Sequence, residues 1–195
     1  MLEEIRLARP SDSEALLKIY APFVENTSVT FEIQVPTAEE FSNRIHDITQ
    51  EYPYLLYCVG EQIVGYAYAA RHRQRAAYAY DVDTSIYIEP NYHGRGIAAR
   101  LYQRLFSILA EQGIYNLYAA YTEPNEKSRR FHEKMGFRPV GTFHQTGYKF
   151  GRWHDVTWME KSLQEHNVPQ GEVKSVKALP DGLMERILEG QRTLI

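Results

Sequence analysis

One stretch, residues 80–99 with the sequence YDVDTSIYIEPNYHGRGIAA, limits what this chain can fold into more than any other. Its first half is rich in β-branched and aromatic residues, which predicts a strand that ends where Pro90 and Asn91 supply turn chemistry. Beyond Ala98, apolar residues recur at three- and four-residue spacing, which predicts a helix. The stretch is therefore expected to form a strand, a short loop and the beginning of a helix.

Two glycines, Gly94 and Gly96, lie in the predicted loop. A residue without Cβ lets backbone N–H groups approach a ligand closely. The first N–H groups of the following helix are unpaired and its dipole is positive there, so the loop favours an anion, most naturally a phosphate. Arg95 and Arg100 add positive charge. The same Gly-Arg-Gly pattern is, by itself, also typical of an ordinary turn.

Helix and strand signals continue along the rest of the chain. Ser11 followed by Glu14, and Thr37 followed by Glu40, are capping-box patterns that predict helix starts. The first helix is expected to end near residue 25 and the second before Pro53. Strands are expected at residues 3–9, 54–59, 63–70, 78–88, 115–121, 137–150 and 153–162.

Composition narrows the function classes. With 195 residues and 44% hydrophobic content, the chain is expected to bury a core of its own. A net charge of −3 gives no electrostatic reason to expect a nucleic-acid or membrane partner. The single cysteine, Cys58, is compatible with a reduced cytoplasmic location. The seven histidines show no metal-ligand spacing, so no metal is expected.

Residues 93–98, HGRGIA, resemble the pyrophosphate loop of the GNAT superfamily of N-acetyltransferases, whose pattern is Gln/Arg-x-x-Gly-x-Gly/Ala. Gly96 and Ala98 match this pattern, and His93 stands where Gln or Arg is usual. Residues 125–137, NEKSRRFHEKMGF, are similar to the second cofactor segment of that family. The resemblance implies acetyl-CoA as acetyl donor. It implies these cofactor-binding residues: Ile86, Tyr87, Ile88, Gly94, Arg95, Gly96, Ile97, Ala98, Ala99, Asn125 and Ser128.

A closer resemblance, over about residues 3 to 163, is to phosphinothricin N-acetyltransferases and their relatives that acetylate methionine sulfone and sulfoximine. It rests on the loop above and on residues 27–31, 82–88 and 147–156. The resemblance implies an α/β fold with a mixed, mostly antiparallel central sheet flanked by helices. It also implies a small amino-acid-like amine as substrate, and we expect a homodimer. The GNAT domain is assigned to residues 1–163, and residues 164–195 to a C-terminal extension.

Acyl transfer to an amine requires the amine to be neutral, so some group must accept its proton. On the strand expected at 78–88, Asp81 and Asp83 share a face, and a second carboxylate nearby is one means of raising a carboxyl pKa. Asp83 aligns with the family's base, which is normally Glu, so a water is expected to bridge the shorter reach. In the opposing interpretation Asp83 is an edge or ion-pair carboxylate.

His132 aligns with the residue near the coenzyme A sulfur and is a candidate for protonating the thiolate; the alternative is a surface or capping histidine.

The most basic short stretch, residues 71–78 with sequence RHRQRAAY, follows the predicted hairpin. Arg73 or Arg75 is expected to bind a substrate carboxylate through two parallel hydrogen bonds, with Tyr78 beside it. Phe31 is a candidate wall of the substrate pocket. The alternatives are a solvated loop for the arginines and a core aromatic for Phe31.

Several alternatives stay open. Leu183, Ile187 and Leu188 predict one short amphipathic helix in the extension, without deciding whether it packs on its own domain, packs on a partner or stays mobile. The pattern shows no Ser or Cys nucleophile with a paired base, so direct attack on acetyl-CoA is expected. Another small amine or a peptide N-terminus could be the substrate, and a non-catalytic acyl-CoA-binding module is the alternative from a different class.

Overall fold

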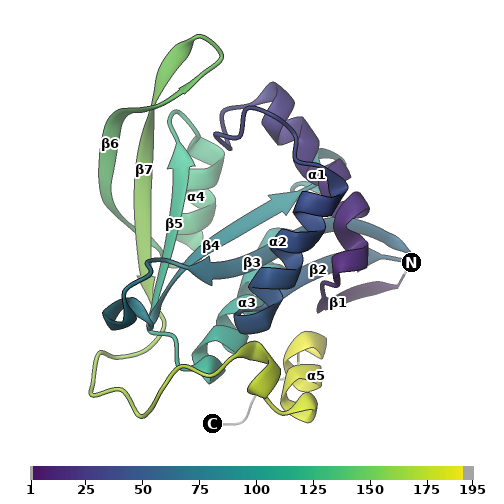
Figure 1. The fold of residues 1–195 in the computed structure, drawn as a ribbon, viewed down its shortest axis with the longest axis vertical. Helices are drawn as coiled ribbons and strands as arrows, with labels where there is room; N and C mark the ends of the chain where they lie inside the picture. The colour runs from purple at the N-terminus through teal and green to yellow at the C-terminus, as the bar shows by residue number, and fades with distance from the viewer. Residues whose placement is uncertain (1, 191–195) are drawn as a thin grey trace.

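The computed structural model describes residues 2–190, and its centre is one seven-stranded sheet (Figure 1). The strand order is β1-β2-β3-β4-β5-β7-β6, and every neighbouring pair is antiparallel except β4 and β5. The strands are β1 (Glu3–Leu7), β2 (Tyr54–Val59), β3 (Gln62–Arg71), β4 (Asp81–Ile88), β5 (Asn116–Thr122), β6 (Arg138–Lys149) and β7 (Arg152–Ser162). The predicted mixed, mostly antiparallel sheet is confirmed.

Helices cover both faces of the sheet (Figure 1). They are α1 (Ser13–Asn26), α2 (Ala38–Glu51), α3 (Ile97–Gln112), α4 (Glu126–Lys134) and α5 (Asp181–Glu189). Alternation along the strands divides the apolar residues between two clusters. Leu56 and Tyr66 pack under α1 and α2, whereas Leu55 and Val82 pack with α3 and α5 on the opposite face.

Local chemistry explains where most elements begin. The Thr37 hydroxyl accepts the N–H of Glu40, whose carboxylate accepts the N–H of Thr37, so this capping box is confirmed. The capping box expected at Ser11 and Glu14 is wrong. A 3-10 turn begins at Pro10 instead, because the Asp12 carboxylate accepts the N–H of Arg9 at 2.8 Å.

The strand expected from residue 78 begins later, at Asp81. A 3-10 turn, η2 (Ala76–Tyr78), occupies the preceding residues, and the Tyr78 N–H donates to the Arg75 carbonyl at 3.0 Å. The basic stretch therefore forms a compact loop between β3 and β4 rather than part of the ladder.

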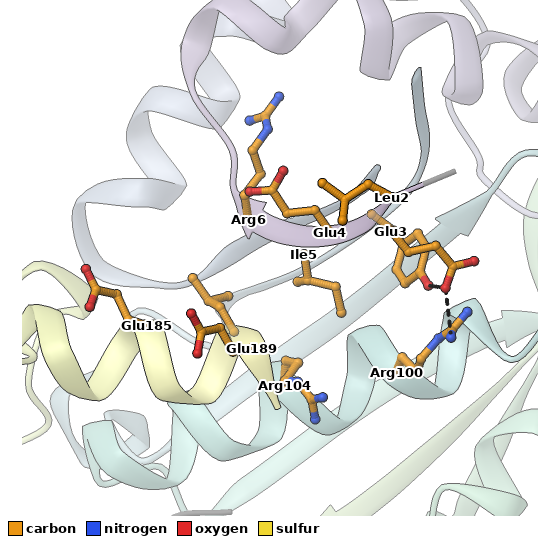
Figure 2. Close-up of a pocket in the computed structure, with 11 residues that line it drawn as sticks. Leu2, Glu3, Glu4, Ile5, Arg6, Arg100, Arg104, Glu185 and Glu189 are labelled. Carbon is orange, nitrogen blue, oxygen red and sulfur yellow. Dashed lines mark hydrogen bonds and ion pairs between the residues drawn. The ribbon is translucent and has the colours of Figure 1, made fainter. Parts of the chain in front are cut away.

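The C-terminal extension packs on its own domain. Met184 and Ile187 of α5 are buried in the α3 cluster, together with Val176 and Leu179 from the segment before it. A groove of about 580 Å³ lies between β1, α3 and α5. Figure 2 shows residues that line it, among them Arg100, Arg104 and Glu185. The last five residues of the predicted extension, 191–195, lie outside the described residues.

Candidate active site

The β4–β5 ladder ends abruptly, and this sets the position of the site. The two strands pair in parallel only from Asp81 to Asp83, opposite Asn116 to Tyr118. Just beyond, the Thr84 hydroxyl donates to the Tyr118 carbonyl at 3.1 Å. β4 continues to Ile88 paired only with β3, so its backbone beyond Asp83 has no ladder partner on the β5 side within residues 2–190. An opening in the sheet therefore begins beside Asp83.

Asp83 projects from the α1/α2 face of the sheet at the end of this ladder. His72 Nδ1 lies 2.7 Å from Asp83 Oδ1. Burial raises the pKa of the Asp83 carboxyl above its usual range, although the hydrogen bond from His72 acts in the opposite direction. A raised pKa makes a carboxylate a better proton acceptor near neutral pH.

Asp81 does not supply this effect. Its carboxylate accepts a hydrogen bond from Asn116 Nδ2 at 2.8 Å, and burial, not a neighbouring carboxylate, is the main cause of the raised Asp83 pKa. Asp81, the expected second carboxylate, therefore serves the contact between β4 and β5. The pKa of Asp83 is raised by partial desolvation at the end of the ladder instead.

The basic loop places its three arginines differently. Arg71 pairs with Glu51 at 2.8 Å, away from the site. Arg73 Nε donates to His72 Nε2 at 3.3 Å, and the Arg73 guanidinium lies over the Tyr78 ring at 5.3 Å from its centroid. Arg75 precedes η2 and is exposed. Of the two predicted carboxylate ligands, Arg73 is therefore the one connected to Asp83.

Aromatic residues extend the α1/α2 face from Asp83 toward the loop between the two helices. Tyr68 lies opposite Ser85, and Tyr66 lies opposite Tyr87, whose ring meets Tyr20 edge-on at 5.1 Å. Desolvation raises the pKa of Tyr20 to about 12. These phenols therefore stay neutral at physiological pH and form an aromatic wall beside the carboxylate.

Phe31 closes the far side of this wall and is 37% exposed. Its ring lies 6.1 Å from the His154 ring, and it occupies the space where a Cβ on Gly147 would stand. Lys149 anchors the same loop, because its Nζ donates to the carbonyls of Val24 at 2.7 Å and Thr30 at 2.9 Å. Sequence reasoning missed Lys149, because a lysine in a strand gives no sign that its ammonium group is buried.

The glycine loop has the geometry that its sequence predicts. Gly94 and Gly96 have φ values of +78° and +77°, which side chains with a Cβ rarely adopt. The first hydrogen bond of α3 runs from Arg100 N to Gly96 O, so the N–H groups of Ile97 to Ala99 have no partner within the helix. The first turn of α3 carries no acidic residue. The loop can therefore bind an anion at the helix N-terminus.

Neighbouring side chains hold this loop in place. His93 Nε2 lies 2.9 Å from the Ile88 carbonyl, and its Nδ1 lies 2.5 Å from Lys127 Nζ of α4. Arg95 packs over the Tyr92 ring at 4.7 Å. Arg100 pairs with Glu3 at 3.1 Å and lies over the Tyr57 ring. Part of the positive charge expected near the loop is therefore already paired.

The second predicted segment forms the N-terminus of α4 next to this loop. Asn125 caps the helix by accepting the Ser128 N–H at 3.1 Å. His132 is 5% exposed; its Nδ1 lies 2.9 Å from the Ser128 carbonyl, and its Nε2 lies 3.3 Å from the Tyr102 hydroxyl. Burial lowers the pKa of His132. His132 packs with α3 on the face opposite Asp83, so the structure does not bring the two predicted catalytic residues into contact.

Comparison with known proteins decides the family. The model of the acetyltransferase (GNAT) domain matches residues 5–158. The chain belongs to the GNAT family. It is therefore an enzyme, an acetyltransferase. The chain is 37% identical over 164 residues to a phosphinothricin N-acetyltransferase of Streptomyces coelicolor, covering 82% of this chain and 96% of the relative.

Two further relatives extend this result. An L-methionine sulfoximine/L-methionine sulfone acetyltransferase of Salmonella typhimurium is 30% identical over 169 residues, covering 85% of this chain and 97% of the relative. The crystal structure of a GNAT superfamily phosphinothricin acetyltransferase from Sinorhizobium meliloti, in complex with acetyl-CoA, has a TM-score of 0.83 at 32% identity. That alignment covers 89% of this chain and 96% of the other.

Within residues 2–190, no group of three His, Cys, Asp or Glu side chains comes together in a way that could hold a metal ion. No helix in that range combines the length and the apolar character that crossing a membrane requires.

Proposed function

We propose that this GNAT enzyme transfers the acetyl group of acetyl-CoA to the amine of a small amino-acid-like substrate, of the phosphinothricin, methionine sulfone or methionine sulfoximine type. The observation that carries the proposal is that one strand, β4, positions both parts of the chemistry. Asp83 stands where β4 and β5 separate, and the glycine loop with Gly94 and Gly96 follows the end of the same strand at Ile88.

The cofactor site uses backbone donors. The unpaired N–H groups of Ile97 to Ala99, with the close approach allowed by Gly94 and Gly96, bind the pyrophosphate of acetyl-CoA. The edge of β4 from Ile86 to Ile88, which has no strand partner on the β5 side within residues 2–190, binds the pantetheine arm. Acetyl-CoA in the Sinorhizobium relative supports this assignment. Arg95, Asn125 and Ser128 complete the proposed contacts by virtue of their place around the loop and the start of α4.

The reaction proceeds by direct attack in a ternary complex. Asp83 accepts a proton from the substrate ammonium, and its raised pKa suits it to that role. The neutral amine attacks the thioester carbonyl; a C–N bond forms, the C–S bond breaks and coenzyme A leaves as the thiolate. The nitrogen loses its second proton as the amide forms, and protonation of the thiolate to the free thiol balances that loss. His132 stays the candidate for protonating that thiolate, and its Nε2 lies 3.3 Å from the Tyr102 hydroxyl of α3.

The substrate occupies the α1/α2 face beside Asp83. Arg73 and Arg75 are the proposed carboxylate ligands, with Tyr78 supporting the Arg73 guanidinium. The exposed ring of Phe31 forms the far wall. A site with an arginine on one side of His72 and a carboxylate on the other suits a molecule that carries both a carboxylate and an amine.

A thiol-release assay tests this function directly. Purified enzyme is supplied with acetyl-CoA and a panel of free amino acids, including phosphinothricin, methionine sulfone and methionine sulfoximine, with an amine-free control. We expect amine-dependent thiol release, with an N-acetyl product confirmed by mass spectrometry. Arg73→Ala and Arg75→Ala, compared with each other, identify which arginine raises the KM for the amine. Acetyl-CoA binding without amine-dependent release would indicate a non-catalytic acyl-CoA-binding module.

We further propose a homodimer that works in the cytoplasm. The β6–β7 hairpin, at one edge of the sheet in Figure 1, exposes several large apolar side chains. They are Val140, Phe143, Tyr148, Phe150 and Trp153. An exposed apolar group of this kind is typical of a protein–protein interface. Light scattering after gel filtration tests the dimer, and a monomer at micromolar concentration would contradict it.

A further inference from the structure

His72 occupies the space between the two ends of the proposed substrate site. Its Nδ1 lies 2.7 Å from Asp83 Oδ1 on β4, and its Nε2 lies 3.3 Å from Arg73 Nε. The ring stacks on Tyr118 of β5 at 4.3 Å and meets Trp158 of β7 edge-on at 5.8 Å. Only 12% of the side chain is exposed. Three strands therefore fix the ring in one orientation.

The partners of His72 determine its tautomer. A guanidinium is always protonated and can only donate, so Arg73 Nε–H donates to His72 Nε2. A neutral imidazole that accepts at Nε2 carries its proton on Nδ1, and that proton is donated to Asp83 Oδ1. Asp83 Oδ2 accepts no hydrogen bond from residues 2–190, which leaves this oxygen for the substrate amine.

We propose that His72 is a positioning residue: it orients the Asp83 carboxylate toward the amine and couples it to Arg73, which binds the substrate carboxylate. This inference rests on the proposed function and adds a substrate rule to it. In an α-amino acid, the amine and the carboxylate are attached to the same carbon. A rigid link from Arg73 through His72 to Asp83 fixes the spacing of the two subsites, and so selects α-amino acids over homologues with a longer separation.

The link also has an electrostatic consequence. Burial raises the pKa of Asp83, and the hydrogen bond from His72 lowers it. Removing His72 leaves the effect of burial unopposed, so the pKa of Asp83 rises further and the carboxylate ionises only at higher pH. The other charged or titratable groups around this pair are Arg73 from the loop, Asp81 and Tyr68 from β4 and β3, and Tyr118 and Glu160 from β5 and β7. They stay in place in the variants below.

Two substitutions separate positioning from packing. His72→Phe keeps an aromatic ring between Tyr118 and Trp158 but removes both hydrogen bonds. His72→Asn places an amide N–H where Nδ1–H stood and so keeps the bond to Asp83. The matched control is His144→Phe, because His144 Nδ1 also lies 2.8 Å from a carboxylate, that of Asp155, but on the exposed β6–β7 hairpin.

The first readout does not depend on turnover. The Asp83 carboxyl carbon is followed by 13C NMR against pH, assigned by its loss in Asp83→Asn. We expect a higher Asp83 pKa in His72→Phe than in the wild type, and a wild-type value in His144→Phe. An unchanged Asp83 titration in His72→Phe would overturn the proposal even if the enzyme acetylates amines. Failure of the wild type to acetylate any amine would overturn the proposed function while leaving this titration as an independent result.

The second readout is kinetic. We expect the acid limb of kcat/KM to move to higher pH in His72→Phe, with a loss of about 10- to 100-fold at neutral pH because the carboxylate is misplaced. His72→Asn should keep the wild-type limb and recover most of the activity. We also expect the ratio of kcat/KM for methionine sulfone to kcat/KM for its β-amino homologue to be smaller in His72→Phe than in the wild type. Loss of activity in both His72 variants with full activity in Asp83→Asn would instead make the imidazole itself the base, and would contradict the proposal.

Discussion

The replacement Asp83→Asn tests the proton acceptor with little change in shape. The amide oxygen of Asn can still accept the hydrogen bond that His72 now donates at 2.7 Å, so the loop is expected to stay in place. The variant loses the charge that accepts the ammonium proton. A positioned general base contributes about 10²- to 10⁴-fold to rate. The expected effect therefore falls on turnover and not on acetyl-CoA affinity.

The exposure of Asp83 places the effect within that range. Its side chain keeps 36% of its surface exposed, so water can partly replace the carboxylate as proton acceptor in the variant. We therefore expect the lower end, a loss of about 10²-fold in kcat/KM at pH 7, which corresponds to about 3 kcal/mol in activation free energy. In the variant only the neutral amine reacts, so its activity should rise about tenfold for each pH unit until the amine titrates.

Thiol release measured between pH 6 and 9.5 checks this expectation, with Asp81→Asn as the matched control on the same strand. Asp81 is bound to Asn116 and is expected to leave the acid limb unchanged. Activity of Asp83→Asn within about threefold of the wild type at pH 7 would refute the assignment, since a base contributes at least about 10²-fold.

The same variant makes a stability prediction with a definite sign. The folded-state pKa of Asp83 lies above the ordinary value of an aspartate side chain, so the folded state binds more protons than the unfolded state between the ordinary and the raised value. Stability therefore falls as pH rises through this window, and the ionised carboxylate destabilises the fold at neutral pH. Asp83→Asn should raise the Tm at pH 7, and the gain should shrink as the pH falls below the window.

Three further substitutions test the surrounding site. Gly96→Ala should cost about 1–2 kcal/mol in unfolding free energy, because φ is +77° there, and should weaken acetyl-CoA binding by calorimetry. Gly147→Ala should displace the Phe31 ring and raise the KM for the amine more than it lowers the Tm; an unchanged KM would contradict the wall assignment. Lys149→Met leaves two carbonyls without their donor and should cost about 2–4 kcal/mol by urea unfolding.

Local patterns in the sequence predicted the parts of the site that depend on local structure. The glycine loop and α3 follow from turn chemistry and apolar spacing, and Asn125 caps its helix where the pattern indicates. The first helix start was wrong because Asp12, held by Arg6 across six residues, caps the backbone at Arg9, two residues before the pattern predicts. A tertiary ion pair decided that boundary, and local spacing does not contain it.

His72 shows why the rest of the site could not be predicted. Its contact with Asp83 depends on the β3–β4 register, in which Ala70 lies opposite Asp83 and His72 follows on the same face. Nine residues of loop and 3-10 turn separate the two strands, from His72 to Tyr80, so no short-turn rule fixes that register. The signal that could have indicated this contact is the place of His72 in the basic loop, two residues after Ala70, which pairs with Asp83. Lys149 depends likewise on contacts with residues more than a hundred positions away.

A crystal structure with coenzyme A and a substrate amino acid tests the central claim most directly. The account predicts the pyrophosphate within hydrogen-bond distance of the backbone nitrogens of Ile97 to Ala99, the sulfur in the opening where β4 leaves β5, and the amine beside Asp83. A pyrophosphate bound elsewhere, or an amine on the far face of the sheet from Asp83, would contradict it.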